Sequence, residues 1–323
     1  MEPPRGAVDA CIDRSQASAT HGVQPRAGST FDSGVPHERR RRLWIAGQPI
    51  ERRIFVLFLD FAIEEDAMKR QRYNVSFPPS EPAQLGQDEA YFYLVEDGQE
   101  IRLRFHDYGE IYKRPGLYEQ LFYQRLKCAS PKTVCGILAN VLRASRVEMS
   151  ELRVLDLGAG NGMVGELLEV ARVIGIDISR EAYVACERDR PGAYDAYYVT
   201  DLCNLSDATR QELLDWQIDC LTCVAALGFG DIPTKAFSTA FNLVKPGGWV
   251  AFNIKETFLQ ESDVSGFSRL TKHLLVSDTL EVHHLERYRH RISIDGHPLF
   301  YYALVGKKET DISREILREF ENS

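Results

Sequence analysis

The stretch that decides the fold is Val154-Leu155-Asp156-Leu157-Gly158-Ala159-Gly160-Asn161-Gly162, an apolar run with one acidic residue that leads directly into three alternate glycines. The apolar run predicts a buried strand, and the glycines predict a loop whose backbone a ligand can approach closely. A helix-like stretch over residues 163–170 follows. Residues 171–177 then predict a second buried strand that ends in Asp177, nineteen residues after Gly158. This order of strand, glycine loop, helix, strand and acid is typical of a nucleoside-binding βαβ unit.

The spacing of the glycines narrows the choice of ligand. A dinucleotide-binding loop needs G-x-G-x-x-G, but position 163 is methionine and the third glycine is Gly162. This spacing favours a ligand without a pyrophosphate, although a glycine-rich turn that serves some other ligand stays open. The pattern D-x-G-x-G-x-G resembles motif I of the class I S-adenosylmethionine (SAM) dependent methyltransferases. Residues 227–233 and the Lys-Pro-Gly-Gly at 245–248 resemble the small-molecule-like methyltransferase-domain group of that family.

The order of predicted elements agrees with this resemblance. Further strands are predicted at 197–200, 218–224 and 249–254, and a final pair at 280–287 and 299–305. Helices are predicted at 179–188, 233–244 and 267–275, with serine or proline at the first two starts. The resemblance implies an α/β fold, with a Rossmann-like, seven-stranded, mostly parallel sheet and a C-terminal antiparallel hairpin. A small β-hairpin and a helical lid precede the sheet.

Four segments are expected along the chain. Residues 1–67 have the Pro-, Gly-, Ser- and Arg-rich composition of a disordered tail, and Met68 is favoured as the natural start. Residues 68–149 hold a hairpin over 91–105 on an Asp-Gly turn, and helices over 117–127 and 131–144. The methyltransferase domain covers 150–308, and 309–323 form a C-terminal tail.

Composition limits the partners of the 323-residue chain. A net charge of −8 argues against a broad basic surface, and therefore against a nucleic acid as acceptor. The apolar run over residues 54–63 is too short to span a membrane. Seven cysteines, an odd number in predicted core segments, favour reduced thiols and a cytoplasmic protein. No metal site is expected, because Cys220 and Cys223 lie three apart in a predicted strand and face opposite sides.

The resemblance assigns the cofactor SAM to the ends of the predicted strands. It places Asp156 near the methionine ammonium, Asp177 on the ribose, and Asp201 on the adenine amino group. The full set of expected cofactor residues is Asp156, Gly158, Ala159, Gly160, Gly162, Asp177, Ile178, Asp201, Leu202 and Ala225. A second interpretation stays open for two of them: Asp177 and Asp201 could instead cap the helices that begin near Ser179 and Ser206.

The acceptor is expected to be a small molecule, methylated by direct in-line displacement. The stretch after the fourth strand lacks the Asn- or Asp-Pro-Pro-aromatic run of amino methylases. His106 is the preferred general base, because its segment adjoins the expected pocket. The other lid or acceptor residues are Tyr108, Tyr112, Tyr118, Phe229, His284 and Tyr288. An exposed edge strand is the competing interpretation of the histidines near 284. A protein or RNA methyltransferase, or a non-catalytic SAM-binding module, remains the alternative function.

Overall fold

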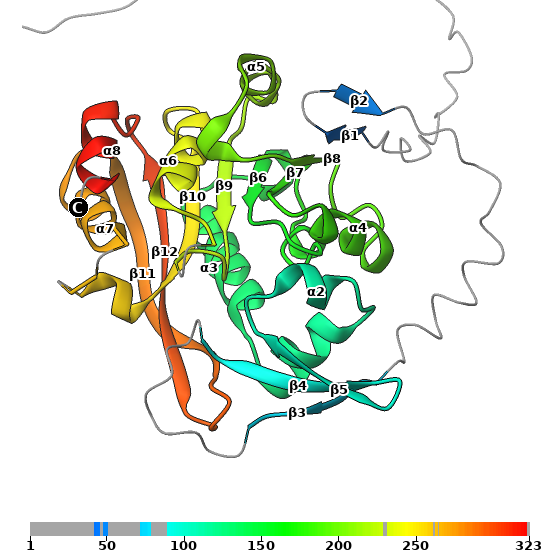
Figure 1. Ribbon diagram of the computed structural model, residues 1–323. Coiled ribbons are helices and arrows are strands. Elements are labelled where there is room, and N and C mark those ends of the chain that lie inside the picture. Colours follow the sequence, from blue (N-terminus) through cyan, green and yellow to red (C-terminus); the bar gives the residue numbers. More distant parts are fainter. Residues whose placement is uncertain are drawn as a thin grey trace, which may run out of the picture. The chain divides into compact units, whose positions relative to one another are not determined.

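In a computed structural model of the chain, the described residues are 42–45, 48–50, 72–78, 89–228, 231–260, 262–263 and 265–321. They form a large mixed sheet with the strand order β11-β12-β10-β9-β6-β7-β8-β1-β2, and a separate three-stranded sheet (Figure 1). The first seven strands of this order are the predicted Rossmann-like sheet. No helix among these residues has the length and apolar character to cross a bilayer.

The strand order reverses at the centre of the large sheet, and this reversal positions the site. Strand β6 (Arg153–Leu157) lies between two parallel neighbours, β7 (Arg172–Asp177) and β9 (Cys220–Cys223). The sheet continues with β8 (Ala196–Val199) beyond β7 and with β10 (Trp249–Lys255) beyond β9. Ligands of open α/β sheets bind beyond the carboxyl ends of the strands at such a reversal.

Helices cover both faces of the sheet, because successive side chains of each buried strand point to opposite sides. On one face, Leu155 belongs to the same core as residues of α5 (Asp207–Asp215), α6 (Thr234–Leu243), α7 (Phe267–Val276) and α8 (Arg314–Glu321). On the other face, Val154 packs with residues of α3 (Ser130–Ala144) and α4 (Arg180–Asp189). Helix α8 lies in the segment predicted as a C-terminal tail.

The C-terminal hairpin is confirmed and is longer than predicted. Strands β11 (Leu280–Ile292) and β12 (Pro298–Lys308) are antiparallel, and β12 also pairs antiparallel with β10. Their far end reaches the small sheet of β3 (Asn74–Ser76), β4 (Tyr91–Glu96) and β5 (Gln99–Arg104) (Figure 1). The β4–β5 hairpin turns at Asp97 and Gly98, both with positive φ, as the Asp-Gly pair predicts.

Two predicted helices differ from the structure. Only a 3-10 turn, Gly165–Leu167, forms within 163–170. Glycine is a weak helix former, and here Gly165 admits the Tyr194 ring, which would lie 2.7 Å from an added Cβ. Residues 117–127 contain a π-helix, Glu119–Arg125, instead of an α-helix. Helix α2 (Tyr108–Tyr112) precedes it.

Strands β1 (Arg42–Ile45) and β2 (Gln48–Ile50) fall within the segment whose composition predicts disorder. β1 pairs in parallel with β8, so the sheet gains two strands at that edge. The remainder of residues 1–67 lies outside the described residues, and its predicted disorder stays a prediction.

Candidate functional site

A cavity of about 1100 Å³, its open mouth included, lies beyond the carboxyl ends of β6 to β9. Its wall combines the glycine loop, the ends of β7 and β8, the bend after β9, and the lid segment before α3. Of the predicted site residues, the cavity is lined by Gly158, Ala159, Gly160, Asp177, Ile178, Asp201, Leu202, Ala225, Tyr108, Tyr112 and Tyr118. The structure therefore brings together most residues that the sequence assigned to cofactor and lid.

The glycine loop needs glycine for both conformation and close packing. Gly158, Gly160 and Gly162 have φ of 73°, 53° and 90°. An added Cβ would lie 2.7 Å from the Ala226 Cβ at position 158, and 2.7 Å from the Tyr112 hydroxyl at position 160. The neighbouring side chains of the cavity wall therefore leave no room for a side chain at positions 158 and 160. Gly162 lies outside the cavity wall, and its added Cβ would meet the Cys186 sulfur at 3.0 Å.

Asp177 ends β7 in the cavity wall and fixes the glycine loop. One carboxylate oxygen accepts a hydrogen bond from the Gly160 N–H, and the other accepts one from the Ser179 N–H, each at 2.9 Å. The cap of α4 is the Ser179 hydroxyl, which accepts from the Ala182 N–H. Each Asp177 oxygen keeps a lone pair for a ligand. Burial raises the pKa of Asp177, although the backbone hydrogen bonds oppose this effect.

Asp156 lies beneath the loop and does not line the cavity. It is 1% exposed, and it accepts hydrogen bonds from the Tyr194 hydroxyl and the Thr222 hydroxyl, each at 2.7 Å. The Tyr194 hydroxyl also lies 3.2 Å from the Ala159 carbonyl oxygen. Burial raises the pKa of Asp156 to about 7. Asp156 therefore supports the glycine loop from beneath, whereas the resemblance placed it near the ammonium of the ligand.

Two roles were open for Asp201, a contact with the cofactor and a helix cap, and its position in the structure agrees with part of each. Its carboxylate accepts from the Cys203 N–H at 2.8 Å and from the Asn204 amide at 2.7 Å, so it caps the 3-10 turn Leu202–Asn204. The helix that follows is capped by Ser206 instead. Asp201 also lines the cavity beside Leu202. Ile178 is 68% exposed at the rim, an unusual exposure for isoleucine.

Four tyrosines form the lid side of the cavity: Tyr108, Tyr112, Tyr118 and Tyr123. The ring centroids of Tyr112 and Tyr118 lie 5.1 Å apart, and those of Tyr118 and Tyr123 lie 6.1 Å apart. Sequence analysis missed Tyr123, whose position in the π-helix gave no periodic signal. The lid is tied to the glycine loop, because Glu119 accepts from the Asn161 amide and pairs with Arg190, each at 2.8 Å.

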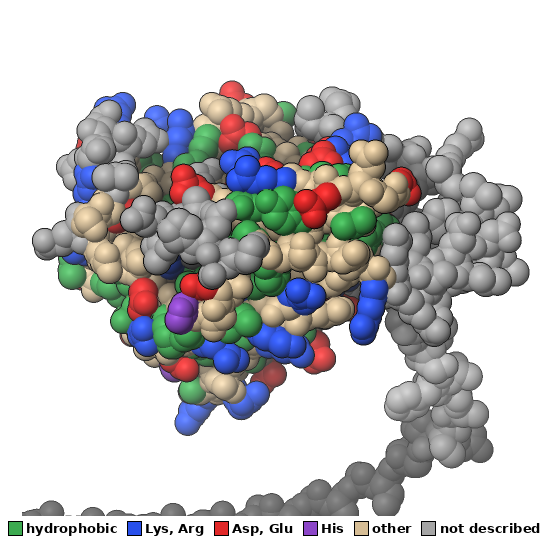
Figure 2. Space-filling model, turned by 60° about the horizontal axis from the view of Figure 1, so that its bottom comes forward, with side chains coloured by type: hydrophobic (Ala, Val, Ile, Leu, Met, Phe, Trp, Pro, Cys, Tyr) green, Lys and Arg blue, Asp and Glu red, His purple; other side chains and the backbone are tan. Residues whose placement is uncertain are grey.

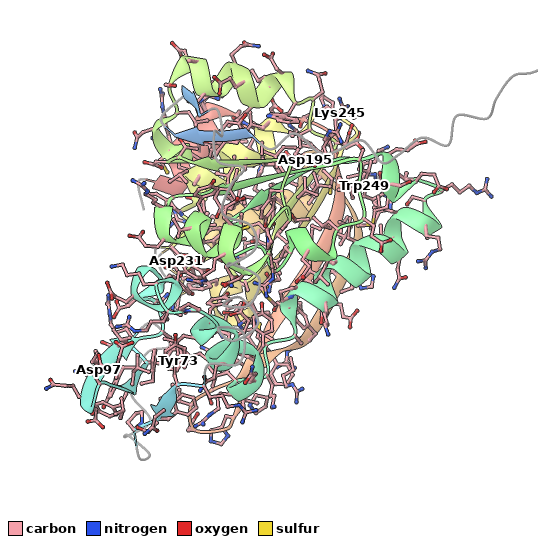
Figure 3. All side chains as sticks on the ribbon, turned by 90° about the vertical axis from the view of Figure 1, so that its right-hand side faces the viewer. Tyr73, Asp97, Asp195, Asp231, Lys245 and Trp249 are labelled. Carbon is pink, nitrogen blue, oxygen red and sulfur yellow. The ribbon has the colours of Figure 1, made fainter. Side chains whose placement is uncertain are left out.

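His106 is paired with a carboxylate that the sequence analysis did not select. Its Nδ1 lies 2.9 Å from an oxygen of Asp231, which lines the cavity after β9 (Figure 3). His106 itself lies behind this carboxylate, outside the cavity wall. Asp231 lies eight residues after the end of β9, so the strand-end pattern that identified Asp177 and Asp201 did not select it.

The remaining acceptor-side predictions lie away from the cavity. His284 bonds to Glu286 at 3.0 Å on the edge strand β11, as the competing interpretation proposed. Tyr288 is 8% exposed, and its hydroxyl contacts Ser130 and Asn253 instead of the cavity. Phe229 lies outside the described residues.

A glycine loop at the reversal of a parallel sheet, with a carboxylate at the end of the adjoining strand, is the arrangement of the class I SAM-dependent methyltransferases, and the chain contains such a domain. Residues 155–252 match the family model described as a methyltransferase domain.

Individual relatives match about a third of the chain. The ubiquinone biosynthesis O-methyltransferase of Paraburkholderia phymatum is 31% identical over 111 residues, 34% of this chain and 47% of that protein. Its counterpart from Thiobacillus denitrificans is 30% identical over the same shares. The chain thus spans about half the length of these curated relatives.

Solved structures that are similar include an N-methyltransferase from Bradyrhizobium japonicum in complex with S-adenosylhomocysteine. It has 12% identity and a TM-score of 0.44, with 64% of this chain and 98% of that chain covered. Magnesium protoporphyrin IX methyltransferase from Synechocystis, with bound SAM, has 15% identity and a TM-score of 0.40, with 55% and 79% covered.

Proposed function

We propose that the protein transfers a methyl group from SAM to a small-molecule acceptor by direct in-line displacement. One observation carries this proposal: the described residues that line the cavity include three carboxylates, Asp177, Asp201 and Asp231, and no lysine, arginine or histidine. SAM has a sulfonium and an ammonium against a single carboxylate, so its net charge is positive. A negative wall suits this cation and disfavours the pyrophosphate of a dinucleotide.

The residues present fit SAM. Asp177 would accept from the ribose hydroxyls with its remaining lone pairs. Asp201 and Leu202 would hold the adenine, with Ile178 against its ring, and the Ala225 carbonyl would accept from the ammonium. The lid tyrosines present aromatic faces and hydroxyl oxygens to a cation. When bound, SAM supplies an activated methyl group, and the protein's part is to align the acceptor and to exclude water.

We propose the His106–Asp231 pair as the general base for an acceptor that arrives protonated, such as a hydroxyl group. Asp231 is the member in the cavity wall, and its hydrogen bond to Nδ1 fixes the orientation of the imidazole. A carboxylate and an imidazole in contact can share a proton taken from the acceptor. The O-methyltransferase relatives agree with this chemistry, over a match of about a third of this chain.

The small-molecule acceptor and a cytoplasmic location belong to the same proposal. On the described part of the face in Figure 2, acidic side chains are interspersed among the basic ones, unlike the basic band that a nucleic acid requires. No disulfide joins any of the six cysteines in the described residues, as in a reducing compartment.

Calorimetric titration of the full chain with SAM tests the cofactor assignment. Asp177→Ala should weaken SAM binding by about 100-fold or more, because two charge-assisted hydrogen bonds to the ribose are lost. Asp215→Ala, at an exposed end of α5, is the matched control and should bind SAM like the unchanged protein. Undiminished SAM affinity in Asp177→Ala would contradict the site.

Incubation with tritiated SAM and fractionated cell extract tests the transfer itself. Label in the low-molecular-weight fraction supports a small-molecule acceptor, whereas label in protein or RNA would overturn it. SAM binding without release of S-adenosylhomocysteine, with every acceptor pool, would establish a non-catalytic SAM-binding module instead.

A further inference from the structure

The bend after β9 contains a strained residue in the cavity wall. Ala225 has φ of 58°, and it is the one non-glycine residue with positive φ among the described residues that line the cavity. The left-handed conformation is unfavourable for alanine, because its Cβ crowds the following carbonyl oxygen. Such strain persists only where the surrounding structure imposes it.

Asn253 makes a direct hydrogen bond with this strained residue. It lies on β10, next to β9, and its side chain is fully buried. Its amide oxygen accepts a hydrogen bond from the Ala225 N–H at 2.6 Å. The bend then places Ala226 against the glycine loop, where its Cβ fills the space that a side chain at position 158 would need. The amide of Asn253 therefore sets how two walls of the cavity meet.

The amide of Asn253 is itself oriented by a chain of hydrogen bonds. Since its oxygen accepts from Ala225, its nitrogen must donate, and it lies 2.7 Å from the Tyr288 hydroxyl and 3.2 Å from the Ser130 hydroxyl. Tyr288 can then donate to Ser130 at 2.6 Å, and Ser130 to Nδ1 of His290 at 2.6 Å. Each group in this series of hydrogen bonds therefore donates in the direction of His290, whose Nδ1 accepts the last hydrogen bond.

This direction requires a neutral His290. The ring is buried and stacks on Tyr301 with centroids 4.0 Å apart. Burial lowers the pKa of His290 well below its usual value, so the imidazole is neutral at physiological pH. This series of hydrogen bonds thus links the C-terminal hairpin to the cavity wall, although neither Tyr288 nor His290 lines the cavity.

We propose that Asn253 is a positioning residue that holds Ala225 in the left-handed conformation needed for SAM binding, and that Tyr288, Ser130 and His290 hold Asn253 in turn. This inference rests on the proposed function, because the wall that Asn253 shapes is the one assigned to SAM. It gives Tyr288 a role in positioning, in place of the predicted role at the acceptor.

A double substitution tests the proposal. Asn253→Ala should weaken SAM binding by about tenfold, the cost of holding Ala225 in its strained conformation without a partner. Ala225→Gly in the same background should restore the affinity, because glycine adopts positive φ without strain. A purely structural loss at Asn253 would not respond to glycine at position 225.

Asn242→Ala is the matched control. This asparagine also makes two hydrogen bonds with the backbone of Ile312, one to its carbonyl oxygen and one from its N–H. It lies on α6, however, away from the cavity. It should lower the melting temperature while SAM affinity stays unchanged. If Ala225→Gly fails to restore SAM binding to a folded Asn253→Ala protein, the proposal is overturned, while SAM binding by the unchanged protein keeps the proposed function.

Hydrogen exchange without ligand separates the two hypotheses. The amide of Ala225 should exchange faster in Asn253→Ala than in the unchanged protein, and should be unaffected in Asn242→Ala. Unchanged exchange at Ala225 would refute the role of Asn253, whether or not SAM binds. Faster exchange in a protein that binds no SAM would instead refute the proposed function alone.

Discussion

Aspartates lie at both ends of the strands of the parallel sheet, and the two groups differ in whether they have basic partners. At the amino ends, Asp219 directly precedes β9 and Asp195 directly precedes β8, and both have basic partners: Arg153 and Lys245 for the former, Arg172 for the latter. At the carboxyl ends, Asp156 and Asp177 have none in the described residues. Figure 3 shows Asp195 and Lys245 near one end, apart from Asp231 at the other.

The pKa values of Asp219, Asp156 and Asp177 differ in the same way, whereas Asp201 has a lowered pKa because its carboxylate accepts from the Cys203 N–H and the Asn204 amide. Burial alone would raise the pKa of Asp219, but hydrogen bonds from Arg153 and Lys245 lower it to about 2. Burial raises the pKa of both Asp156 and Asp177. Asp219 thus has its counter-charges within the chain, whereas Asp177, in the cavity wall, has no basic partner in the described residues and is available to a cationic ligand.

The largest expected effect is on turnover, at Asp231. Asp231→Asn keeps the size of the side chain but removes the charge that orients and stabilises a protonated His106, so kcat should fall about 100-fold, and SAM affinity should fall by a smaller factor because one of the three wall carboxylates loses its charge. The measurement is release of S-adenosylhomocysteine with an acceptor pool that supports turnover. Glu110→Gln, on the exposed side of α2, is the control and should keep full activity. An Asp231→Asn protein with unreduced kcat would remove the pair from the chemistry.

A smaller effect, on stability alone, is expected at the opposite end. Asp219→Ala should lower the free energy of unfolding by about 2 kcal/mol, because the Arg153 N–H and guanidinium lose a nearly buried acceptor. Both basic side chains are partly exposed, which limits the loss. Urea denaturation measures it, and calorimetry should show unchanged SAM affinity. A strong loss of SAM binding in folded Asp219→Ala would abolish the division between the two ends.

The fold and the cofactor wall could be predicted from the sequence where local signals were strong. The alternate glycines after Leu157, the Asp-Gly turn at 97–98 and the serine before α4 all act through their own backbone or that of near neighbours. They indicated the succession of strands along the chain, the hairpins and most of the cofactor wall.

The remaining features depend on contacts between distant parts of the chain. His106 and Asp231 lie 125 positions apart, and Asn253 meets Ser130 across 123. No periodicity or capping pattern reports such a pair. The helix expected after Gly162 failed for a related reason, since the Tyr194 ring occupies the space beside Gly165. Asp156 and Asp177 both belong to predicted strands, and only the packing around Tyr194 and Thr222 shows that Asp156 lies beneath the loop.

The smallest expected effect concerns this buried carboxylate and the pH. The pKa of Asp156 is about 7 in the folded protein against 3.8 for an ordinary aspartate, so the folded state binds this proton more tightly than the unfolded state. Its contribution to stability is therefore greatest in acid and is lost as the pH rises from about 4 through 7.

Between pH 6 and pH 7 the loss should be about 1 kcal/mol. Asp156→Asn cannot ionise, and its carbonyl oxygen can still accept from Thr222 or Tyr194, so the variant should lack this component of the pH dependence. Urea denaturation of both proteins across this interval measures the difference. Parallel curves would show that Asp156 stays ionised in the folded protein, and the contrast between the two ends of the sheet would then rest on Asp177 alone.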